Sequence, residues 1–277
     1  MKKDMTFGKE WKHILLFTLP IMAGHLLQQL YNTVDGVIVG QFVGEDAFAG
    51  VATCQPLTFF FLAFAMGLSI GVGIVVAQYF GAGQHDKLPV SIDTALILLG
   101  ACGLLLMAVG IVAAPMILKD ILNVPLNVLP NAVAYFRIYA LGLFFQFIYN
   151  AVAAILRGLG NSKAILFFLL IATILNTILD LVFVVVFEWE VVGAAIATVM
   201  AQAACVIVSY RYMRKRFPFY RKMPHWDPAI CGTMTRLGLP IAIQQSIVSI
   251  GQGSMQRLVN VFDDSFPGVM AAYGAGG

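Results

Sequence analysis

Long uncharged stretches constrain this chain more than any other feature of its sequence. They run from Ile14 to Val34, Thr94 to Leu118, Ile138 to Leu156, Val191 to Tyr210 and Leu237 to Gln256. Each has about the 20 residues that are needed to cross a hydrocarbon core of about 30 Å. Because backbone groups cannot stay unpaired in lipid, spans of this length predict α-helices rather than barrel strands.

Two further stretches complete the set. The stretch from Ala47 to Gln84 ends in a turn-like sequence, and the stretch from Ala164 to Phe187 is interrupted only by Asp180. The sequence therefore predicts an all-α integral membrane protein, a polytopic helix bundle with about seven transmembrane helices. These spans lie near residues 14–40, 50–80, 92–117, 132–156, 164–187, 191–213 and 237–261.

The composition agrees with a lipid environment. Sixty per cent of the 277 residues are hydrophobic and 11% are charged, and the mean hydropathy is +0.87. A soluble domain is closer to half apolar and a quarter charged. The net charge of +3 gives no indication of nucleic-acid binding. We expect no cleaved signal peptide, because the polar start leads into a full-length span, and the four cysteines lack metal-ligand spacing.

The distribution of basic residues predicts the orientation. With the N-terminus placed inside, Lys119 is the only one of the 17 Lys and Arg residues in an outer loop. Arg137 and Arg257 lie within or at the ends of spans, and all the others fall in inner segments. This bias indicates a cytoplasmic N-terminus and supports the seven-span alternation, because a missed span would scramble it.

An incomplete internal repeat suggests how the chain is divided. Shifting the sequence by 220 positions places Leu19-Pro20-Ile21 on Leu239-Pro240-Ile241, each early in a span that follows a basic segment. Two related halves are common in membrane transporters. We therefore expect a six-helix N-terminal lobe at 1–213, a cytoplasmic linker at 214–236 and the start of a second, repeated lobe at 237–277, with most of that lobe missing.

Ionisable residues inside the membrane are functional candidates. Of the 14 Asp and Glu residues, only Asp35 and Asp180 are expected deep inside spans. An ionised side chain there costs at least about 2.5–3.5 kcal/mol. Asp35 lies ten residues before Glu45, and Asp180 lies eight before Glu188. At 1.5 Å per residue, both carboxylates sit about 12–15 Å below the outer charges, where they can share a pocket.

Oxygen-bearing neighbours lie at the same level. Tyr31 precedes Asp35 by one helical turn, Asn176 precedes Asp180 by one turn, and Thr198 lies at matching depth in the sixth span with Ala194 one turn before it. Oxygen ligands suit hard cations, and two nearby carboxylates in a low dielectric also favour a bound proton. The sequence therefore predicts a Na⁺ or H⁺ site. Pro20 removes a backbone hydrogen bond from the first span and predicts a kink.

Several short motifs, in their order and spacing, resemble the multidrug and toxic compound extrusion (MATE) family over essentially the whole chain. They are Leu19-Pro20, Val34-Asp35-Gly36 through Val39-Gly40, Gln78-Tyr-Phe-Gly-Ala-Gly83, Leu156-Arg-Gly-Leu-Gly-Asn161, Asn176-Thr-Ile-Leu-Asp180 and Gly193-Ala-Ala-Ile-Ala-Thr198. The pattern is similar to bacterial DinF-like, MepA-like and NorM-like members. One departure is that the seventh span has no acid, and Ser249 stands where some members carry a glutamate.

The resemblance implies a non-enzymatic antiporter with two six-helix lobes. Such a protein exchanges cationic or amphipathic drugs, or toxic organic cations, for Na⁺ or H⁺ by alternating access and needs no organic cofactor. It implies a monomer, when full length, in the bacterial plasma (inner) membrane. The family's N-lobe cation site then corresponds to Asp35, Asn176, Asp180 and Thr198, with Ala194 offering a carbonyl and Tyr31 adjacent. Its first-span proline, linked to coupling, corresponds to Pro20.

The sequence leaves two other functions open. A lipid-linked saccharide flippase of the same superfamily would present cationic residues to a pyrophosphate, and only Arg137 and Arg257 are candidates. A more distant alternative is an intramembrane aspartyl enzyme that uses Asp35 and Asp180, although no accompanying catalytic motif is present.

Overall fold

The computed structural model describes residues 45–217 and 225–263, together with scattered positions between 11 and 43. Every element in these two ranges is helical. The elements are α2 (Glu45–Gly81), α3 (Leu88–Met116), η1 (Ile117–Ile121), α4 (Leu129–Gly158), α5 (Ser162–Asp180), η2 (Leu181–Val186), α6 (Glu190–Arg216) and α7 (Pro228–Asp263). The two η segments are π-helical turns that continue α3 and α5.

Local sequence explains where several helices begin and end. Proline stands in the first turn of α3 and of α4, where its missing N–H is not needed. Arg214, Lys215 and Arg216 form the last turn of α6, where cations interact favourably with the helix dipole. Gly83 and Gly160 close the α2–α3 and α4–α5 turns with φ of +68° and +77°, a conformation that glycine adopts without strain.

The structure confirms a polytopic all-α membrane protein. Five helical stretches of the described residues are long and apolar enough to cross a membrane, and they match the second to sixth expected spans. Helix α7 has 36 residues. It is not among the five stretches, and its sequence includes the polar residues Gln244, Gln245, Gln252 and Gln256. The seventh span therefore stays a prediction. The first expected span, 14–40, falls largely outside the described residues.

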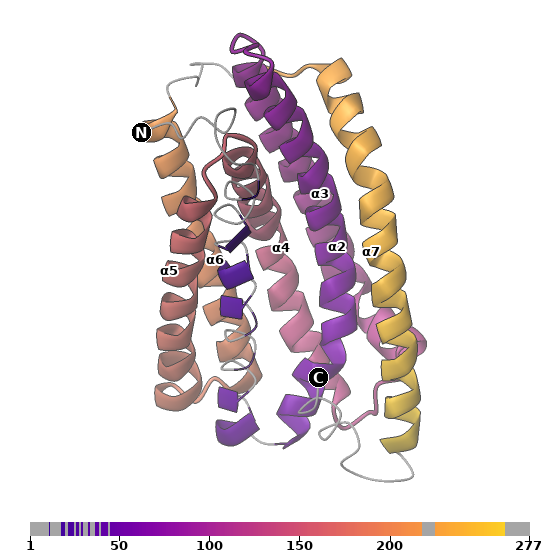
Figure 1. The fold of residues 1–277 in the computed structure, drawn as a ribbon. Helices are drawn as coiled ribbons and strands as arrows, with labels where there is room; N and C mark the ends of the chain where they lie inside the picture. The colour runs from indigo at the N-terminus through magenta and orange to yellow at the C-terminus, as the bar shows by residue number, and fades with distance from the viewer. Residues whose placement is uncertain are drawn as a thin grey trace.

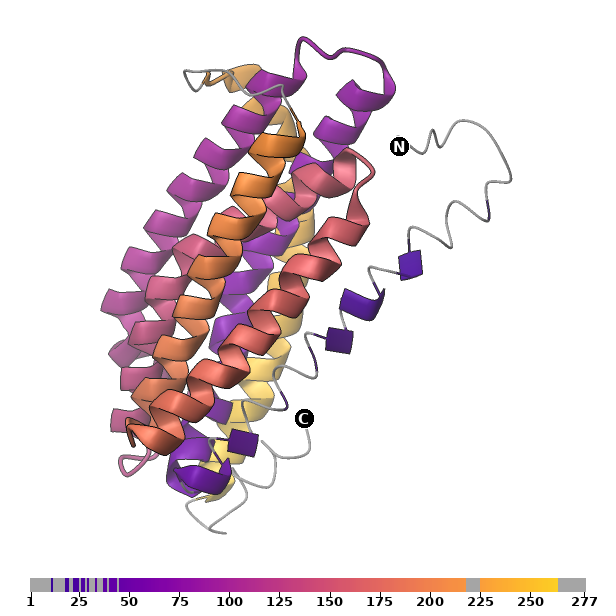
Figure 2. The same cartoon turned by 90° about the vertical axis from the view of Figure 1, so that its left-hand side faces the viewer.

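Helix α4 lies at the centre of the bundle. It packs against α2, α3 and α6, while α5 packs on α6 at one side and α7 packs on α2 at the other (Figure 1). The perpendicular view shows α5 and α6 together in front of the remaining helices (Figure 2). Glycines bring neighbours close: a Cβ at Gly103 of α3 would lie 2.9 Å from the Cβ of Phe147 in α4.

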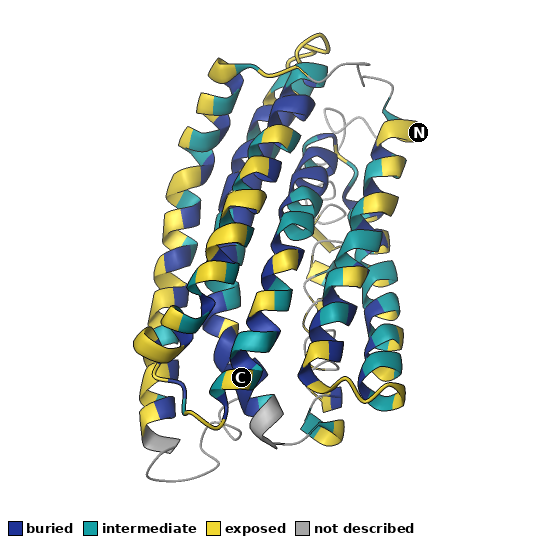
Figure 3. Ribbon diagram, turned by 180° about the vertical axis from the view of Figure 1, so that it is seen from behind, coloured by how far each residue is buried: buried dark blue, intermediate teal, exposed yellow. Residues whose placement is uncertain are grey.

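Large apolar side chains cover much of the outer surface of the bundle. Buried positions line the inner faces of the helices and exposed positions cover their outer faces (Figure 3). Large exposed side chains on α3 include Leu105, Val112 and Met116, which are 64%, 80% and 63% exposed. In water such a surface would drive aggregation. It is the surface expected of helices that face lipid.

The helix order yields a topological prediction. The α2–α3 turn and the α4–α5 turn lie at one end of the bundle, and the α3–α4 and α5–α6 connections lie at the other (Figure 1). We expect Lys87 and Lys163 in the cytoplasm and Lys119 and Glu188 outside. A Glu188→Cys variant should react with a membrane-impermeant thiol reagent added to intact cells. Protection of this cysteine in intact cells, with labelling only after lysis, would reverse the orientation.

Candidate cation site

Helices α5 and α6 carry four of the predicted site residues at one level. Asn176 and Asp180 lie one turn apart on α5, and Ala194 and Thr198 lie one turn apart on α6. Asp180 and Ala194 are completely buried, and Asn176 and Thr198 are 1% and 3% exposed. Tyr31, Asp35 and Pro20 lie outside the described residues. The α5 and α6 halves of the predicted site are therefore enclosed in the protein and do not face lipid.

A side-chain hydrogen bond joins the two helices at this level. The amide Nδ2 of Asn176 donates to the hydroxyl Oγ1 of Thr198 over 3.5 Å. Strong N–H···O bonds are 2.7–3.2 Å long, so this one is weak. It joins α5 to α6 at the level of the predicted site.

Asp180 lies where the backbone of the fifth span changes its winding. It is the last residue of α5, and the π-helical turn η2 follows at once. The N–H of Phe187 donates to the carbonyl of Val182 five residues earlier over 2.9 Å. π-helical turns inside α-helices occur frequently at functional sites, but η2 ends its span, as η1 ends the span that α3 begins. The change of winding after Asp180 therefore gives its position in the helix and is no separate evidence for a site.

Close packing of α6 on η2 completes this wall of the site. A Cβ at Gly193 would lie 3.1 Å from the backbone oxygen of Phe183, so only a residue without a side chain fits without a shift. This contact places Ala194 beside the fifth span. The carbonyl of Ala194 is expected to accept the helical N–H of Thr198, which leaves only its second lone pair for a ligand.

Nearby polar residues have packing roles instead. The hydroxyl of Thr173 donates to the carbonyl of Leu169 in its own helix over 2.9 Å. The side-chain oxygen of Gln202 on α6 lies against Gly142 of α4, where a Cβ would come within 2.9 Å of it. Gln202 thus contacts a second helix, as polar side chains of membrane helices commonly do, whereas the Thr173 hydroxyl bonds within α5. Neither residue belongs to the α5–α6 site.

Sequence reasoning missed a second acid that is buried in the described part of the chain. Asp93, near the start of α3, is only 3% exposed, and its Oδ2 accepts the backbone N–H of His225 over 3.1 Å. The neighbouring Thr94 accepts the N–H of Asp227 over 3.1 Å and donates to the carbonyl of His225 over 3.4 Å. Together they hold the segment that leads into α7. Asp93 stands at the edge of an uncharged run, where charged residues are expected to reach the membrane surface, so its burial could not be predicted from the sequence.

The chain matches a known protein family. The MatE family model matches residues 20–182, more than half of the chain. The chain belongs to the MatE family. This family comprises transporters, not enzymes, which sets aside the intramembrane aspartyl enzyme, and the multidrug extrusion resemblance of the sequence is confirmed.

Individual MatE relatives agree with this assignment. The "Probable multidrug resistance protein YpnP" of Bacillus subtilis (strain 168) is 29% identical over 275 residues, which are 98% of this chain and 60% of that protein. A solved outward-facing MATE family transporter of the MOP superfamily matches 97% of this chain and 63% of its own at 24% identity, with a TM-score of 0.82. An inward-facing one matches 90% of this chain and 56% of its own, again at 24% identity, with a TM-score of 0.79.

These matches also give the extent of the likeness. The chain spans about 60% of the length of the first curated relative that it matches. At 24% identity, the solved structures show the MatE fold alone. The two solved proteins are described as outward-facing and inward-facing, and the fold of this chain resembles both.

Proposed function

We propose that this chain forms part of a secondary active multidrug efflux transporter. It would exchange cationic or amphipathic drugs for Na⁺ or H⁺ by alternating access, in a bacterial plasma membrane with its N-terminus in the cytoplasm. The observation that carries the proposal is the complete burial of Asp180 beside Asn176 and Thr198, between two helices of a MatE-family chain. A buried carboxylate inside a membrane bundle is expensive and marks an ion or proton pathway by default.

The proposed mechanism starts from the cost of that carboxylate. A bound cation or proton neutralises a charge that the membrane disfavours. With Asp35 supplied by the first span and Asp180 by α5, an ion held between them draws these two helices and α6 together. Release of the ion reverses the movement. A change in the bend at Pro20 would carry it into the wall of the drug cavity, since a missing backbone hydrogen bond makes this point of the helix easier to bend.

The domain division stays a proposal. We assign residues 1–213 to a six-helix lobe, 214–236 to an inter-lobe linker and 237–277 to the start of a second lobe. Alternating access requires two lobes that move against each other. The 277-residue chain by itself is therefore expected not to transport. The complete protein is proposed to act as a monomer on small-molecule drugs, in contact with lipid and without nucleic acid.

The flippase alternative is supported less well. Recognition of a pyrophosphate requires cationic side chains that face a cavity. The two candidates, Arg137 on α4 and Arg257 on α7, are exposed in the described part of the chain, and neither belongs to the α5–α6 site. The buried polar groups at the α5–α6 site are acidic and neutral, which favours cations over a pyrophosphate.

Dye efflux from proteoliposomes tests the proposal. A two-lobe transporter that carries this chain is reconstituted, loaded with a cationic dye, and given an inward Na⁺ gradient or an inward H⁺ gradient separately. We expect at least one gradient to drive dye efflux, and the 277-residue chain alone to give none. Absence of efflux under both gradients would refute secondary active export, and efflux by the short chain would refute the need for two lobes.

A further inference from the structure

Helix α7 is attached to the rest of the bundle by two different kinds of contact at its two ends. It runs antiparallel to α2 and packs along it (Figure 1). The end of α7 near Pro228 lies beside the α2–α3 turn, on the predicted cytoplasmic side, and is called the inner end. The end near Asp263 lies beside η1 and the α3–α4 connection, on the predicted external side, and is called the outer end. The chemistry of the two contacts differs, and this difference carries the inference.

The inner contact is a close approach of the two helix backbones. A Cβ built on Gly67 would overlap the backbone of Ala242, and one built on Gly71 would overlap the carbonyl of Met234. In the other direction, a Cβ at Gly238 would lie 2.8 Å from the carbonyl oxygen of Gly67. Small residues four positions apart on both helices permit this approach. Separation of this end loses dispersion contacts for which lipid or water offers no equal replacement.

The outer contact is a buried hydrogen-bonded network. Gln256 Nε2 donates to the hydroxyl of Thr53 on α2 over 3.4 Å and to Asn260 Oδ1 over 2.9 Å. Asn260 Nδ2 donates to the carbonyl of Leu122, just after η1, over 2.7 Å. Thr53 and Asn260 are completely buried, and Gln256 is 2% exposed. The network thus joins α7 both to α2 and to the α3–α4 connection.

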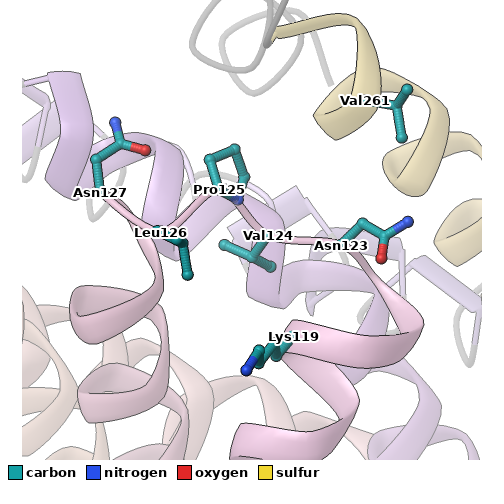
Figure 4. Close-up of a pocket in the computed structure, with 7 residues that line it drawn as sticks. All are labelled: Lys119, Asn123, Val124, Pro125, Leu126, Asn127 and Val261. Carbon is teal, nitrogen blue, oxygen red and sulfur yellow. The ribbon is translucent and has the colours of Figure 1, made fainter.

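A hollow lies next to this network on the outer side. Its volume is about 540 Å³, and it is lined by Lys119, Asn123, Val124, Pro125, Leu126, Asn127 and Val261. Figure 4 shows Val261 of α7 on one side of the hollow and the α3–α4 connection on the other. A space of this size with a charged group and two amides admits water. The hollow borders the residues that follow Leu122 and Asn260 in the chain, while Thr53, Gln256 and Asn260 themselves are buried and do not line it.

We propose that Thr53, Gln256 and Asn260 form an outer latch, which holds the outer end of α7 against the N-terminal lobe and releases it to water while the inner glycine contact stays closed. The latch rests on the proposed function in one respect: its opening would give a transported molecule a path to the outside. Its residues position α7 and do not touch the ion. Neither the sequence motifs nor the α5–α6 site assigns them this role.

The energetics favour opening at the outer end first. Hydrogen bonds between membrane helices contribute little net stability, because their partners find substitutes when the helices part. Water in the hollow provides those substitutes for the amides of Gln256 and Asn260 and for the hydroxyl of Thr53. The glycine contact has no such substitute. Loss of one latch hydrogen bond should therefore shift the open population about threefold to tenfold.

Distance measurements between spin labels on the 277-residue chain in lipid nanodiscs test the latch. An outer pair of labels is placed at the exposed positions Leu126 and Leu258, and an inner pair at the exposed positions Gln78 and Thr233. The background carries Cys102→Ser and Cys231→Ser, and the buried Cys54 and Cys205 are retained. Gln256→Leu should raise the population with a longer outer distance about threefold to tenfold. Thr53→Val loses only the longer 3.4 Å bond and should raise it about threefold, and both variants should leave the inner distance unchanged.

A control variant distinguishes opening of the outer latch from a general loss of stability. Ser249→Ala removes a polar group on the same buried face of α7, but this hydroxyl donates to the carbonyl of Ser246 in its own helix over 2.8 Å, so no shift is expected. Thr53→Val keeps the shape of the side chain, so it covers the case in which Gln256→Leu does not fold. An unchanged outer distance, or an equal shift of both pairs, would overturn the latch. Because no gradient or drug is present, either result is independent of the efflux test.

Discussion

Asp180→Asn is expected to abolish gradient-driven efflux by a two-lobe transporter that carries this chain, while the protein stays folded in the membrane. The side chain keeps its size and loses its charge, so the completely buried position is still filled. The bound cation, however, loses the carboxylate that attracts it. Loss of an outer-shell partner alone typically lowers metal affinity about 10–100-fold, and loss of a direct ligand should cost at least as much. The proteoliposome assay with imposed gradients measures the effect.

Two companions sharpen this prediction. Asp35→Asn should have a similar effect, and the double variant should be little worse than either single one, because residues that act as one unit are not additive. The matched control is Asp120→Asn, which makes the same change of charge at an exposed position in η1 and should transport normally. Efflux at the wild-type rate by both Asp35→Asn and Asp180→Asn would mean that these acids are structural.

Gly71→Ala is expected to destabilise the docking of α7 on α2 by on the order of 3 kcal/mol, near the upper end for overpacked sites. The added Cβ would overlap the carbonyl of Met234, and its next neighbour, the N atom of Gly238, would be only 2.8 Å away. Backbone atoms cannot turn aside as a flexible side chain can, so the two helices must separate. Unfolding of the 277-residue chain in mixed micelles measures the loss.

The control is the same substitution elsewhere on the helix pair. Gly232 lies in α7 with nothing within 4 Å of a built Cβ. Gly232→Ala should therefore stabilise the helix slightly, by up to about 1 kcal/mol, because alanine favours helices more than glycine does. The two substitutions are therefore expected to change the stability in opposite directions. Equal stability of the two variants would show that α2 and α7 do not meet as closely as described.

Span positions were predictable because the membrane imposes them. Charged residues bracket each apolar run, and the helices α2 to α6 follow those runs. Helix ends extended further than expected, as at Arg216 in α6, because basic residues remain helical while they reach the membrane surface. The π-helical turns η1 and η2 were not predictable, since no local residue pattern distinguishes them from the α-helices that they continue.

Part of the candidate site could be predicted from the spacing of residues along a helix. The i, i+4 rule placed Asn176 with Asp180 and Ala194 with Thr198, and the structure buries all four. Contacts between distant segments were not readable. Gln256 and Thr53 are 203 positions apart, and Asp93 meets His225 across 132 positions. Only the packing of the folded chain brings such pairs together, so the outer latch and the Asp93 contact emerged from the structure.

Infrared difference spectroscopy on the purified chain can show whether Asp180 takes part in binding a cation. Spectra are recorded as Na⁺ is added at constant pH and as the pH is lowered without Na⁺, for the wild type, Asp180→Asn and Asp120→Asn. We expect one of the two titrations to change a carboxyl band in the wild type and in Asp120→Asn, and we expect this change to be lost in Asp180→Asn. Identical difference spectra for all three proteins would contradict this expectation.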